Sequence, residues 1–339
     1  MAKVLLTAHC LDQLLEKNYS VITTVRNEEK AQKIRDAYKS LGDRLKVVIV
    51  PDLAKEDAFD DVVAQNPDID SVLHTATDPI KELVDPAVKG TTGILRAVNR
   101  WAPNVRRVVI TSSFASILDE AHLHDPDTTF TEASWNPDTI RDVGRSPATA
   151  YRVSKTLAER SAWDFVSASR GAPSGAEGGS GPASFDLVTI CPPLVLGPVV
   201  DHLVSLESVN TSNERVVDLL RGRWRHSIPS QGPVSLWVDV RDVARAHVRA
   251  LEIPEAGGKR LFTTARYFSN SEIAAIVRNG FPEYADKVPG PEVQGGERPE
   301  PHNTFAFDVS FTDRLLGIRW IDLETSVKDL VKTFKAHGL

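Results

Sequence analysis

Cysteine is scarce in this chain of 339 residues, which contains only Cys10 and Cys191. Two cysteines cannot build the disulfide framework that holds many small secreted domains together, and neither lies in a metal-binding spacing. Each lies in an apolar run, so we expect two buried free thiols, with a disulfide as the alternative. The sequence therefore predicts no metal site.

The chain also lacks a strong charge of either sign and lacks long hydrophobic runs. Its formal net charge of −6 gives no basic field that would attract nucleic acid or a membrane surface. No stretch reaches the ~18 apolar residues that a membrane span requires, and the first residues show no signal-peptide pattern. We expect a cytoplasmic protein, monomeric or homodimeric, that binds neither nucleic acid nor membranes.

The first half of the chain does contain a regular alternation of short apolar runs with amphipathic segments. Strands are expected at residues 4–6, 21–25, 45–50, 71–74, 105–110 and 185–190. Helices are expected at residues 11–16, 28–41 and 58–64, in a long stretch ending at 101, and around Tyr151. Strands that alternate with helices form a parallel sheet with helices on both faces. The sequence therefore predicts an α/β fold with a doubly wound Rossmann sheet, in which ligands bind at the carboxyl ends of the strands.

The pattern loosens after Gly197 and indicates a smaller C-terminal lobe. Strands are expected at residues 237–240 and 260–264, the second being the last strand, and helices at 243–251 and 327–337. We therefore expect a Rossmann domain made of residues 1–195 and 233–266, and a substrate lobe made of residues 196–232 and 267–339. Residues 171–184 are nearly all Gly, Ala, Ser and Pro, which is typical of a flexible surface insertion.

Tyr151 and Lys155 form the first pattern that carries chemistry. Their spacing of four residues puts both side chains on one face of the expected helix. An ammonium group one turn away stabilises a phenolate, which lets the phenol act as a general acid near neutral pH. None of the other tyrosines has a lysine four residues later. Without further context, a surface tyrosine beside a solvated lysine explains the pair equally well.

Two neighbouring patterns supply that context. Thr111-Ser112-Ser113 follows a buried strand, and a hydroxyl at the end of a parallel strand can donate a hydrogen bond to a ligand carbonyl oxygen. A helix cap or a strand-end turn is the alternative for this run. The segment from Pro192 to Pro198 follows another strand, and its prolines would stiffen one wall of a cleft. A plain loop is the alternative there.

In this order and at roughly these spacings, the patterns resemble those of the extended short-chain dehydrogenase/reductases. Within that family the chain resembles the fungal NADPH-dependent aldehyde and ketone reductases, which include methylglyoxal reductase and are related to the plant dihydroflavonol reductases. The motifs that carry the resemblance are Thr111-Ser112-Ser113, Tyr151-x-x-x-Lys155, Pro192-Pro193-x-Val195-x-Gly197-Pro198, Trp237-Val238-Asp239-Val240-Arg241-Asp242-Val243-Ala244, Val50-Pro51-Asp52-Leu53 and His74-Thr75-Ala76.

The resemblance implies an oxidoreductase that reduces a small carbonyl compound with NADPH. It implies that Ser113, Tyr151 and Lys155 are the catalytic residues: Tyr151 donates a proton to the substrate oxygen, and Lys155 activates the tyrosine and holds the nicotinamide ribose. The residues that it implies for cofactor binding, besides Tyr151 and Lys155, are Asp52, Leu53, Thr75, Ala76, Pro192, Val195 and Ser212.

The end of the second strand indicates which nicotinamide cofactor is preferred. An acidic residue there would bind the ribose hydroxyls of NAD. This strand instead ends in Val25-Arg26, and Lys30 follows one helical turn later. Because both cations can pair with a 2′-phosphate, we expect Arg26 and Lys30 to favour NADPH. Two solvated surface cations are the alternative.

The chain departs from the family pattern at two loops. The Gly-x-x-Gly-x-x-Gly/Ala loop after the first strand is absent near Thr7 and His9, and a Ser-Pro-Phe segment is absent after Ala76; about seven residues are missing from each. A misassembled gene sequence, omitted residues and a degraded cofactor site are the competing explanations. Since those glycines bring the pyrophosphate to the N-terminus of the first helix, we expect that helix to be short and NADPH to bind poorly.

Two other functions compete with carbonyl reduction. An NAD-dependent sugar-nucleotide epimerase or dehydratase shares the Tyr-x-x-x-Lys pattern, but Arg26 argues against NAD. A cofactor-sensing relative without catalysis is favoured by the absent glycines and disfavoured by Ser113, Tyr151 and Lys155. The substrate stays open among α-dicarbonyls such as methylglyoxal, bulky aromatic ketones and ketones of secondary metabolism. Trp135 and Trp224 are candidate pocket walls, with packing in the core or on the surface as the alternative.

Overall fold

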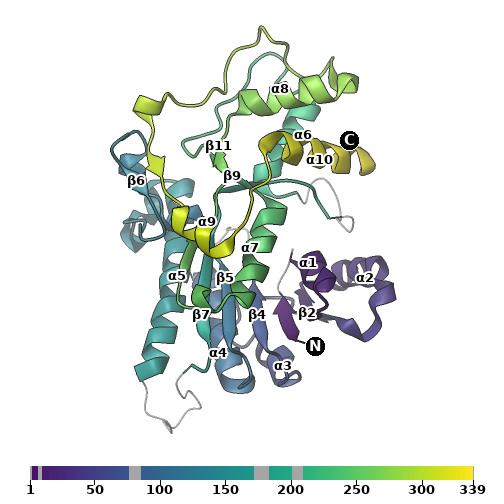
Figure 1. Ribbon diagram of the computed structural model, residues 1–339, viewed down its shortest axis with the longest axis vertical. Coiled ribbons are helices and arrows are strands. Elements are labelled where there is room, and N and C mark those ends of the chain that lie inside the picture. Colours follow the sequence, from purple (N-terminus) through teal and green to yellow (C-terminus); the bar gives the residue numbers. More distant parts are fainter. Residues whose placement is uncertain (1, 7–9, 76–84, 172–182, 201–208, 339) are drawn as a thin grey trace.

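The computed structural model describes residues 2–6, 10–75, 85–171, 183–200 and 209–338 (Figure 1). Its main feature is a parallel sheet of seven strands in the order β10–β7–β5–β4–β1–β2–β3. The strands are β1 (Lys3–Leu6), β2 (Ser20–Val25), β3 (Leu45–Ile49), β4 (Ser71–His74), β5 (Arg107–Thr111), β7 (Asp186–Cys191) and β10 (Arg260–Phe262). Strand order reverses between β1 and β4. This topology confirms the predicted doubly wound α/β fold.

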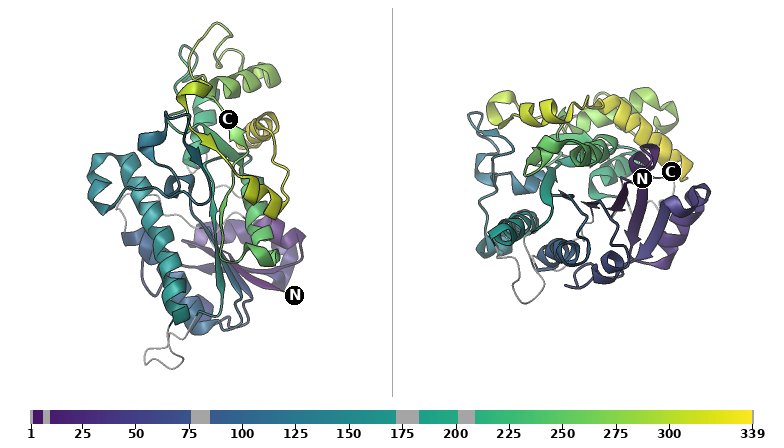
Figure 2. Two further views of the ribbon diagram at one scale, coloured as in Figure 1. Left: turned by 60° about the vertical axis from the view of Figure 1, so that its left-hand side comes forward. Right: turned by 60° about the horizontal axis from the view of Figure 1, so that its bottom comes forward.

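Helices cover both faces of this sheet because successive strand residues point to opposite sides (Figures 1 and 2). Leu5 packs on one face, whereas Val4 and Leu6 pack on the other. The first face is covered by α3 (Asp60–Ala64), α4 (Asp85–Trp101) and α5 (Pro147–Gly171). The second face is covered by α1 (Leu11–Glu16), α2 (Glu28–Ala37), α7 (Val240–Glu252) and α9 (Ser310–Leu316). Burial on both faces explains why most residues of the strands are apolar.

A second core lies beyond the carboxyl ends of these strands, at the top of Figure 1. It is built from α6 (Thr211–Leu220), α8 (Asn270–Gly280), α10 (Leu323–Ala336) and a small sheet of β8 (Leu194–Leu196), β9 (Leu236–Asp239) and β11 (Arg266–Tyr267). Trp224 and Trp237 are buried in this core, so packing is the role of Trp224. Since β9 pairs with β8 and β11, it lies outside the seven-stranded sheet. The division at 195, 233 and 266 stays a prediction.

Two element predictions were wrong. The helix expected at 28–41 ends at Ala37, and the chain continues as a 3-10 segment, Lys39–Arg44, in which Gly42 takes a φ of +53° and redirects the backbone. The strand at 260–264 is not the last one, because β11 follows it and β12 (Ala306–Phe307) pairs with β6 (Thr129–Phe130). Both later strands have only two residues, which is too short for a periodic pattern to appear in the sequence.

Two further expectations concern the thiols and the Gly-rich segment. Cys10 and Cys191 are free and buried, as predicted. Of the insertion expected at 171–184, residues 172–182 lie outside the described residues.

Candidate active site

Helix α5 carries Tyr151 and Lys155 one turn apart at its N-terminal end. Ser146 precedes the helix and accepts a hydrogen bond from the Thr149 amide at 3.0 Å, and Pro147 occupies the first turn, where its missing N–H costs nothing. Tyr151 is 40% exposed, so its phenol is accessible. The Nζ atom of Lys155 lies 5.9 Å from the centre of the Tyr151 ring. The helix therefore presents both groups on one accessible face, as the spacing predicts.

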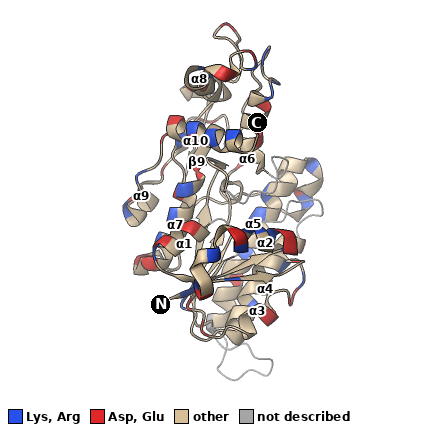
Figure 3. Cartoon of the chain, turned by 90° about the vertical axis from the view of Figure 1, so that its right-hand side faces the viewer, with Lys and Arg blue, Asp and Glu red and all other residues tan. Residues whose placement is uncertain are grey.

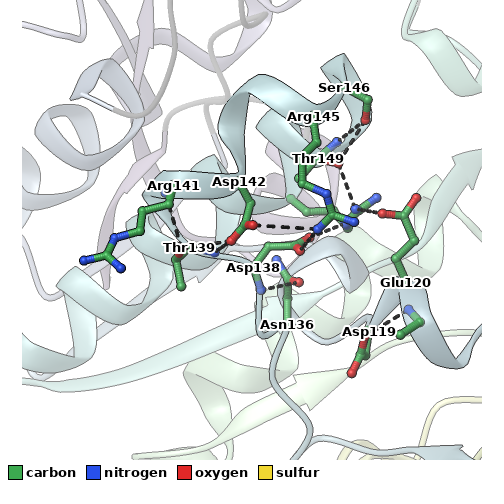
Figure 4. A network of polar contacts seen from close by, with 12 residues as sticks. Asp119, Glu120, Asn136, Asp138, Thr139, Arg141, Asp142, Arg145, Ser146 and Thr149 are labelled. Atoms are coloured by element: carbon green, nitrogen blue, oxygen red, sulfur yellow. Dashed lines mark hydrogen bonds and ion pairs between the residues drawn. The ribbon is translucent and has the colours of Figure 1, made fainter.

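A polar network fixes the segment that leads into this helix (Figure 4). The carboxylate of Asp138 accepts a 2.9 Å hydrogen bond from Arg152 Nε and a 3.3 Å bond from Arg145. Arg152 is buried and also pairs with Glu120 and donates to Thr149. Because Arg152 directly follows Tyr151, the network holds the start of α5 against the segment that runs from 136 to 146.

The three hydroxyls at the end of β5 have different partners. Thr111 Oγ1 lies 2.6 Å from Nε2 of His247 on α7. Ser112 Oγ donates to the carboxylate of Glu159 on α5. Ser113 is the N-cap of the 3-10 turn Phe114–Ser116, and its Oγ atom accepts a hydrogen bond from the Ala115 amide at 3.1 Å. Within the described part of the chain, Ser113 is thus the one hydroxyl of the three whose hydrogen has no assigned acceptor.

Two buried histidines lie near these hydroxyls. Burial lowers the pKa of His247 to about 4, although the bond to the Val243 carbonyl oxygen opposes this shift. Burial, followed by the charge of Lys155, lowers the pKa of His74 to about 4. Both imidazoles are therefore neutral at neutral pH. His247 then donates from Nδ1 to Val243 and accepts from Thr111 at Nε2.

A pocket opens at the carboxyl ends of β4 and β5, between α4 and α5. Lys155 reaches it from α5, and His74, Thr111 and Ser112 reach it from the strands. Its other lining residues are Leu53, Pro86, Ala87, Gly90, Thr91, Ile110, Ser154, Ala158 and Glu159. The pocket lies at the edge of the sheet where doubly wound folds bind ligands.

Glu159 and Arg260 are two residues of this site that the sequence analysis missed. Arg260 Nε donates to Glu159 Oε1 at 2.7 Å, and both side chains are buried. Burial raises the pKa of Glu159, but the charge of Arg260 and hydrogen bonds from Arg260, Ser112 and Ser116 outweigh it, so the pKa lies below its ordinary value. Glu159 is therefore ionised. The position of Glu159, four residues after Lys155 on the same helix, could have indicated a role in the site. The sequence around Arg260 contains no comparable pattern.

The residues expected to select NADPH lie at the end of β2. Arg26 is half-buried directly after the strand, and Lys30 is exposed in the first turn of α2. Glu28 and Glu29 of the same turn pair with Arg35 and Lys33, so basic and acidic groups are interspersed along α2 (Figure 3).

The other residues expected near the adenosine and ribose follow β3 and β4. Asp52 is exposed and accepts a hydrogen bond from the Ala54 amide, and Leu53 lines the pocket. Thr75 directly follows β4 and is half-buried. Ala76 lies outside the described residues, as do Thr7, His9 and the segment expected to lack the Ser-Pro-Phe loop.

The Pro192 to Pro198 segment lies beside Ser113. The Phe114 amide donates to the Pro192 carbonyl oxygen at 2.8 Å, which extends the β5–β7 pairing past the serine. The Val195 amide donates to Ser212 Oγ at 3.2 Å, and the Val195 carbonyl oxygen accepts from Asn210 at 2.9 Å. The start of α6 thus holds the backbone of Val195.

Metal-binding clusters and membrane-spanning helices are both absent from the described residues. These residues contain no group of three or more His, Cys, Asp or Glu side chains that could hold a metal ion. Within the same residues, no helix is both long enough and apolar enough to cross a bilayer.

Several known proteins are similar to this chain along nearly its whole length. The ketoreductase azaE of Aspergillus niger is 38% identical, over 97% of this chain and 96% of its own. The NADPH-dependent methylglyoxal reductase GRE2 of Saccharomyces cerevisiae is 33% identical, over 95% and 92%. The crystal structure of Gre2 from Candida albicans in complex with NADPH superposes with a TM-score of 0.87 at 30% identity and covers 100% of both chains. Residues 5–263 also match the description of one protein family. The chain therefore belongs to the NAD dependent epimerase/dehydratase family.

Proposed function

We propose that this protein reduces an aldehyde or a ketone to an alcohol with NADPH. The observation that carries the proposal is the arrangement at the end of β5, where Thr111 and Ser112 bond to buried partners and Ser113 keeps a hydroxyl hydrogen to donate. Tyr151 and Lys155 lie on the adjoining helix, and Lys155 shares the pocket with Thr111 and Ser112. The names of the relatives, a ketoreductase and NADPH-dependent methylglyoxal reductases, support the same reaction.

Each catalytic residue has a role in this proposal. Ser113 donates a hydrogen bond to the carbonyl oxygen and stabilises the charge that develops there. Tyr151 transfers its phenolic proton to that oxygen, and the Lys155 ammonium stabilises the phenolate that remains. When bound, NADPH supplies the hydride that adds to the carbonyl carbon. The neutral His74 adds no second positive charge beside Lys155.

The side chains of the sheet edge fit NADPH chemically. Arg26 and Lys30 provide cations for a 2′-phosphate at the end of β2, where NAD would require an acid. Lys155 can donate to ribose hydroxyls from the pocket, and Leu53 supplies an apolar wall beneath it. We propose Asp52, Thr75, Ala76, Pro192, Val195 and Ser212 as further cofactor contacts. A small carbonyl compound and NADPH are thus the proposed partners of a cytoplasmic monomer or homodimer.

Loss of NADPH absorbance with a panel of carbonyls tests the proposal. The panel should contain methylglyoxal, isovaleraldehyde and a bulky aromatic ketone, and NADH should be run in parallel. We expect turnover with NADPH and at least one carbonyl, and a loss of roughly 10²–10⁴-fold in kcat for Tyr151→Phe. Because Tyr151 is 40% exposed, the variant should unfold at the same temperature as the parent. Unchanged turnover in Tyr151→Phe would disprove the assigned acid.

The connection between β1 and α1 favours a second candidate function, a relative that senses NADPH without turnover. Helix α1 has only six residues, and its N-cap, Cys10, makes no side-chain capping bond. The sequence before it lacks the glycines that bring phosphate to the helix. NADPH binding without oxidation by any carbonyl in the panel would support this candidate over the reductase.

A further inference from the structure

Glu159 joins the proposed catalytic helix to the strands behind it. Tyr151, Lys155 and Glu159 follow one another at four-residue intervals on α5, but Glu159 points inward and is 1% exposed. Thr189 of β7 donates to its Oε1 atom at 2.7 Å, and Trp163 donates to the same atom at 3.3 Å. A buried carboxylate with this many donors holds a fixed position.

The same carboxylate contacts Ser112 and Ser116, which lie before and after the proposed carbonyl-binding serine in the sequence. Ser112 Oγ and Ser116 Oγ are each hydrogen-bonded to Glu159 Oε2. Ser116 Oγ also lies 2.7 Å from the Ser113 carbonyl oxygen. The turn that carries Ser113 is therefore attached to α5 on either side of the serine.

Arg260 extends this attachment to a third segment. Its guanidinium donates to the carbonyl oxygens of Glu132 and Ser134, and it stacks on Trp135 with its Cζ atom 3.6 Å from the ring centre. It also donates to Ser116 Oγ at 3.2 Å. One arginine thus links the 132–135 segment to the serine turn and to Glu159.

We propose that Glu159 and Arg260 are positioning residues for carbonyl reduction. They keep Ser113 Oγ at a fixed position relative to Tyr151 on α5. This inference rests on the proposed function. The carboxylate keeps the serine turn and the catalytic helix at a fixed separation, and the arginine orients the carboxylate. A displacement of ~1 Å between reacting groups costs about 10²-fold in rate, so loss of this attachment lowers kcat while the groups themselves stay intact.

A partly buried ion pair between β5 and β7 provides a control. Arg107 and Asp186 form a bidentate pair at 2.6 and 2.8 Å, at the amino ends of β5 and β7. Glu159 contacts the carboxyl ends of the same two strands. Asp186→Asn therefore removes a charge from an ion pair at the opposite ends of these strands from Ser113, and it should lower the melting temperature with kcat within about 2-fold of the parent.

The test is a double-mutant cycle that combines Glu159→Gln with Ser113→Ala, with kcat and the dissociation constant of NADPH measured for each variant. We expect Glu159→Gln to lower kcat by roughly 10–100-fold and to leave the NADPH dissociation constant unchanged. In the Ser113→Ala background, Glu159→Gln should lower kcat by less than about 3-fold, because the hydroxyl that Glu159 positions is absent. Asp186→Asn should have the same small effect on kcat whether Ser113 is present or replaced by alanine.

Equal losses of kcat from Glu159→Gln in both backgrounds, or no loss in either, would overturn the positioning role. If Glu159→Gln does not fold, Ser116→Ala provides the same test, since it removes one contact to Glu159 Oε2 and should also lose its effect without Ser113. The absence of NADPH oxidation by the unsubstituted chain would overturn the proposed function itself. That failure is distinguishable from a failure of the positioning role, because it is seen in the unsubstituted chain alone.

Discussion

Thr111 Oγ1 lies 2.6 Å from Nε2 of His247, and Nδ1 of the same ring lies 2.8 Å from the Val243 carbonyl oxygen. The ring donates from Nδ1, so Thr111 gives its hydroxyl hydrogen to His247. Although Thr111 and Ser113 are close in sequence, they therefore have separate roles: Thr111 satisfies a buried imidazole, and Ser113 faces the substrate in the proposed mechanism.

Substitution of the two hydroxyls separates these roles. Ser113→Ala removes a donor to the carbonyl oxygen and should lower kcat by roughly 10²–10³-fold. Thr111→Val should leave kcat within about 3-fold but cost roughly 1–3 kcal/mol of unfolding free energy, because His247 Nε2 loses its buried donor. Steady-state kinetics and urea unfolding measure both effects. A larger loss of kcat in Thr111→Val than in Ser113→Ala would reverse the assignment.

The two buried histidines predict how stability depends on pH. The pKa of each falls from 6.5 to about 4 on folding, so the unfolded chain takes up protons first as the pH decreases. Stability is therefore complete above pH 6.5 and declines toward pH 4, by roughly 3 kcal/mol for each histidine. Urea unfolding at several pH values between 7 and 4 should show this decline. His247→Gln should have a shallower slope than the parent, whereas the change of an exposed histidine, His302→Gln, should not alter it.

Arg26 provides the test of cofactor preference. A charge-assisted bond to the 2′-phosphate is worth about 1.5–3 kcal/mol, so Arg26→Ala should weaken NADPH binding by roughly 10–100-fold and leave NADH binding almost unchanged. Lys30→Ala should have a smaller effect, since Lys30 is exposed. Lys33→Ala on the same helix is the matched control, because Lys33 already pairs with Glu29. Equal weakening of both cofactors by Arg26→Ala would assign the residue a structural role.

The six-residue α1 leads to a prediction about cofactor affinity. The sequence lacks the glycines that would bring backbone N–H groups close to the pyrophosphate, so NADPH should bind more weakly than low-micromolar. Titration of the purified chain, followed by NADPH fluorescence, measures this affinity directly. A dissociation constant in the low-micromolar range would show that other residues replace the loop.

The local patterns of the sequence predicted most of the fold and several residues of the candidate site. Residues 71–74 and 11–16 were assigned with the bounds that β4 and α1 have, because periodicity and apolar runs are local signals. Gly197 of the proline segment has a φ of +125°, and a Cβ there would lie 2.9 Å from Asp239 Oδ2, which explains the glycine. Asp239 itself caps α7 and pairs with Arg241, so this part of the 237–244 motif stabilises the fold rather than a ligand.

The residues missed were those whose partners are distant in sequence. Arg260 meets Glu159 across 101 positions, and His247 meets Thr111 across 136. No periodicity or spacing connects such pairs, because their contact depends on the order of strands in the sheet. The same limit applies to β11 and β12, whose pairing is set by the fold around them.

Trp135 contacts two guanidinium groups, with the Cζ atoms of Arg160 and Arg260 at 4.2 and 3.6 Å from its ring centre. Since Arg260 also holds the carbonyl oxygens of Glu132 and Ser134, both the backbone and the aromatic side chain of this segment depend on one residue. In the proposed arrangement, random substitution of residues 132–135 therefore changes the contacts of Arg260 and, through them, the position of Ser113.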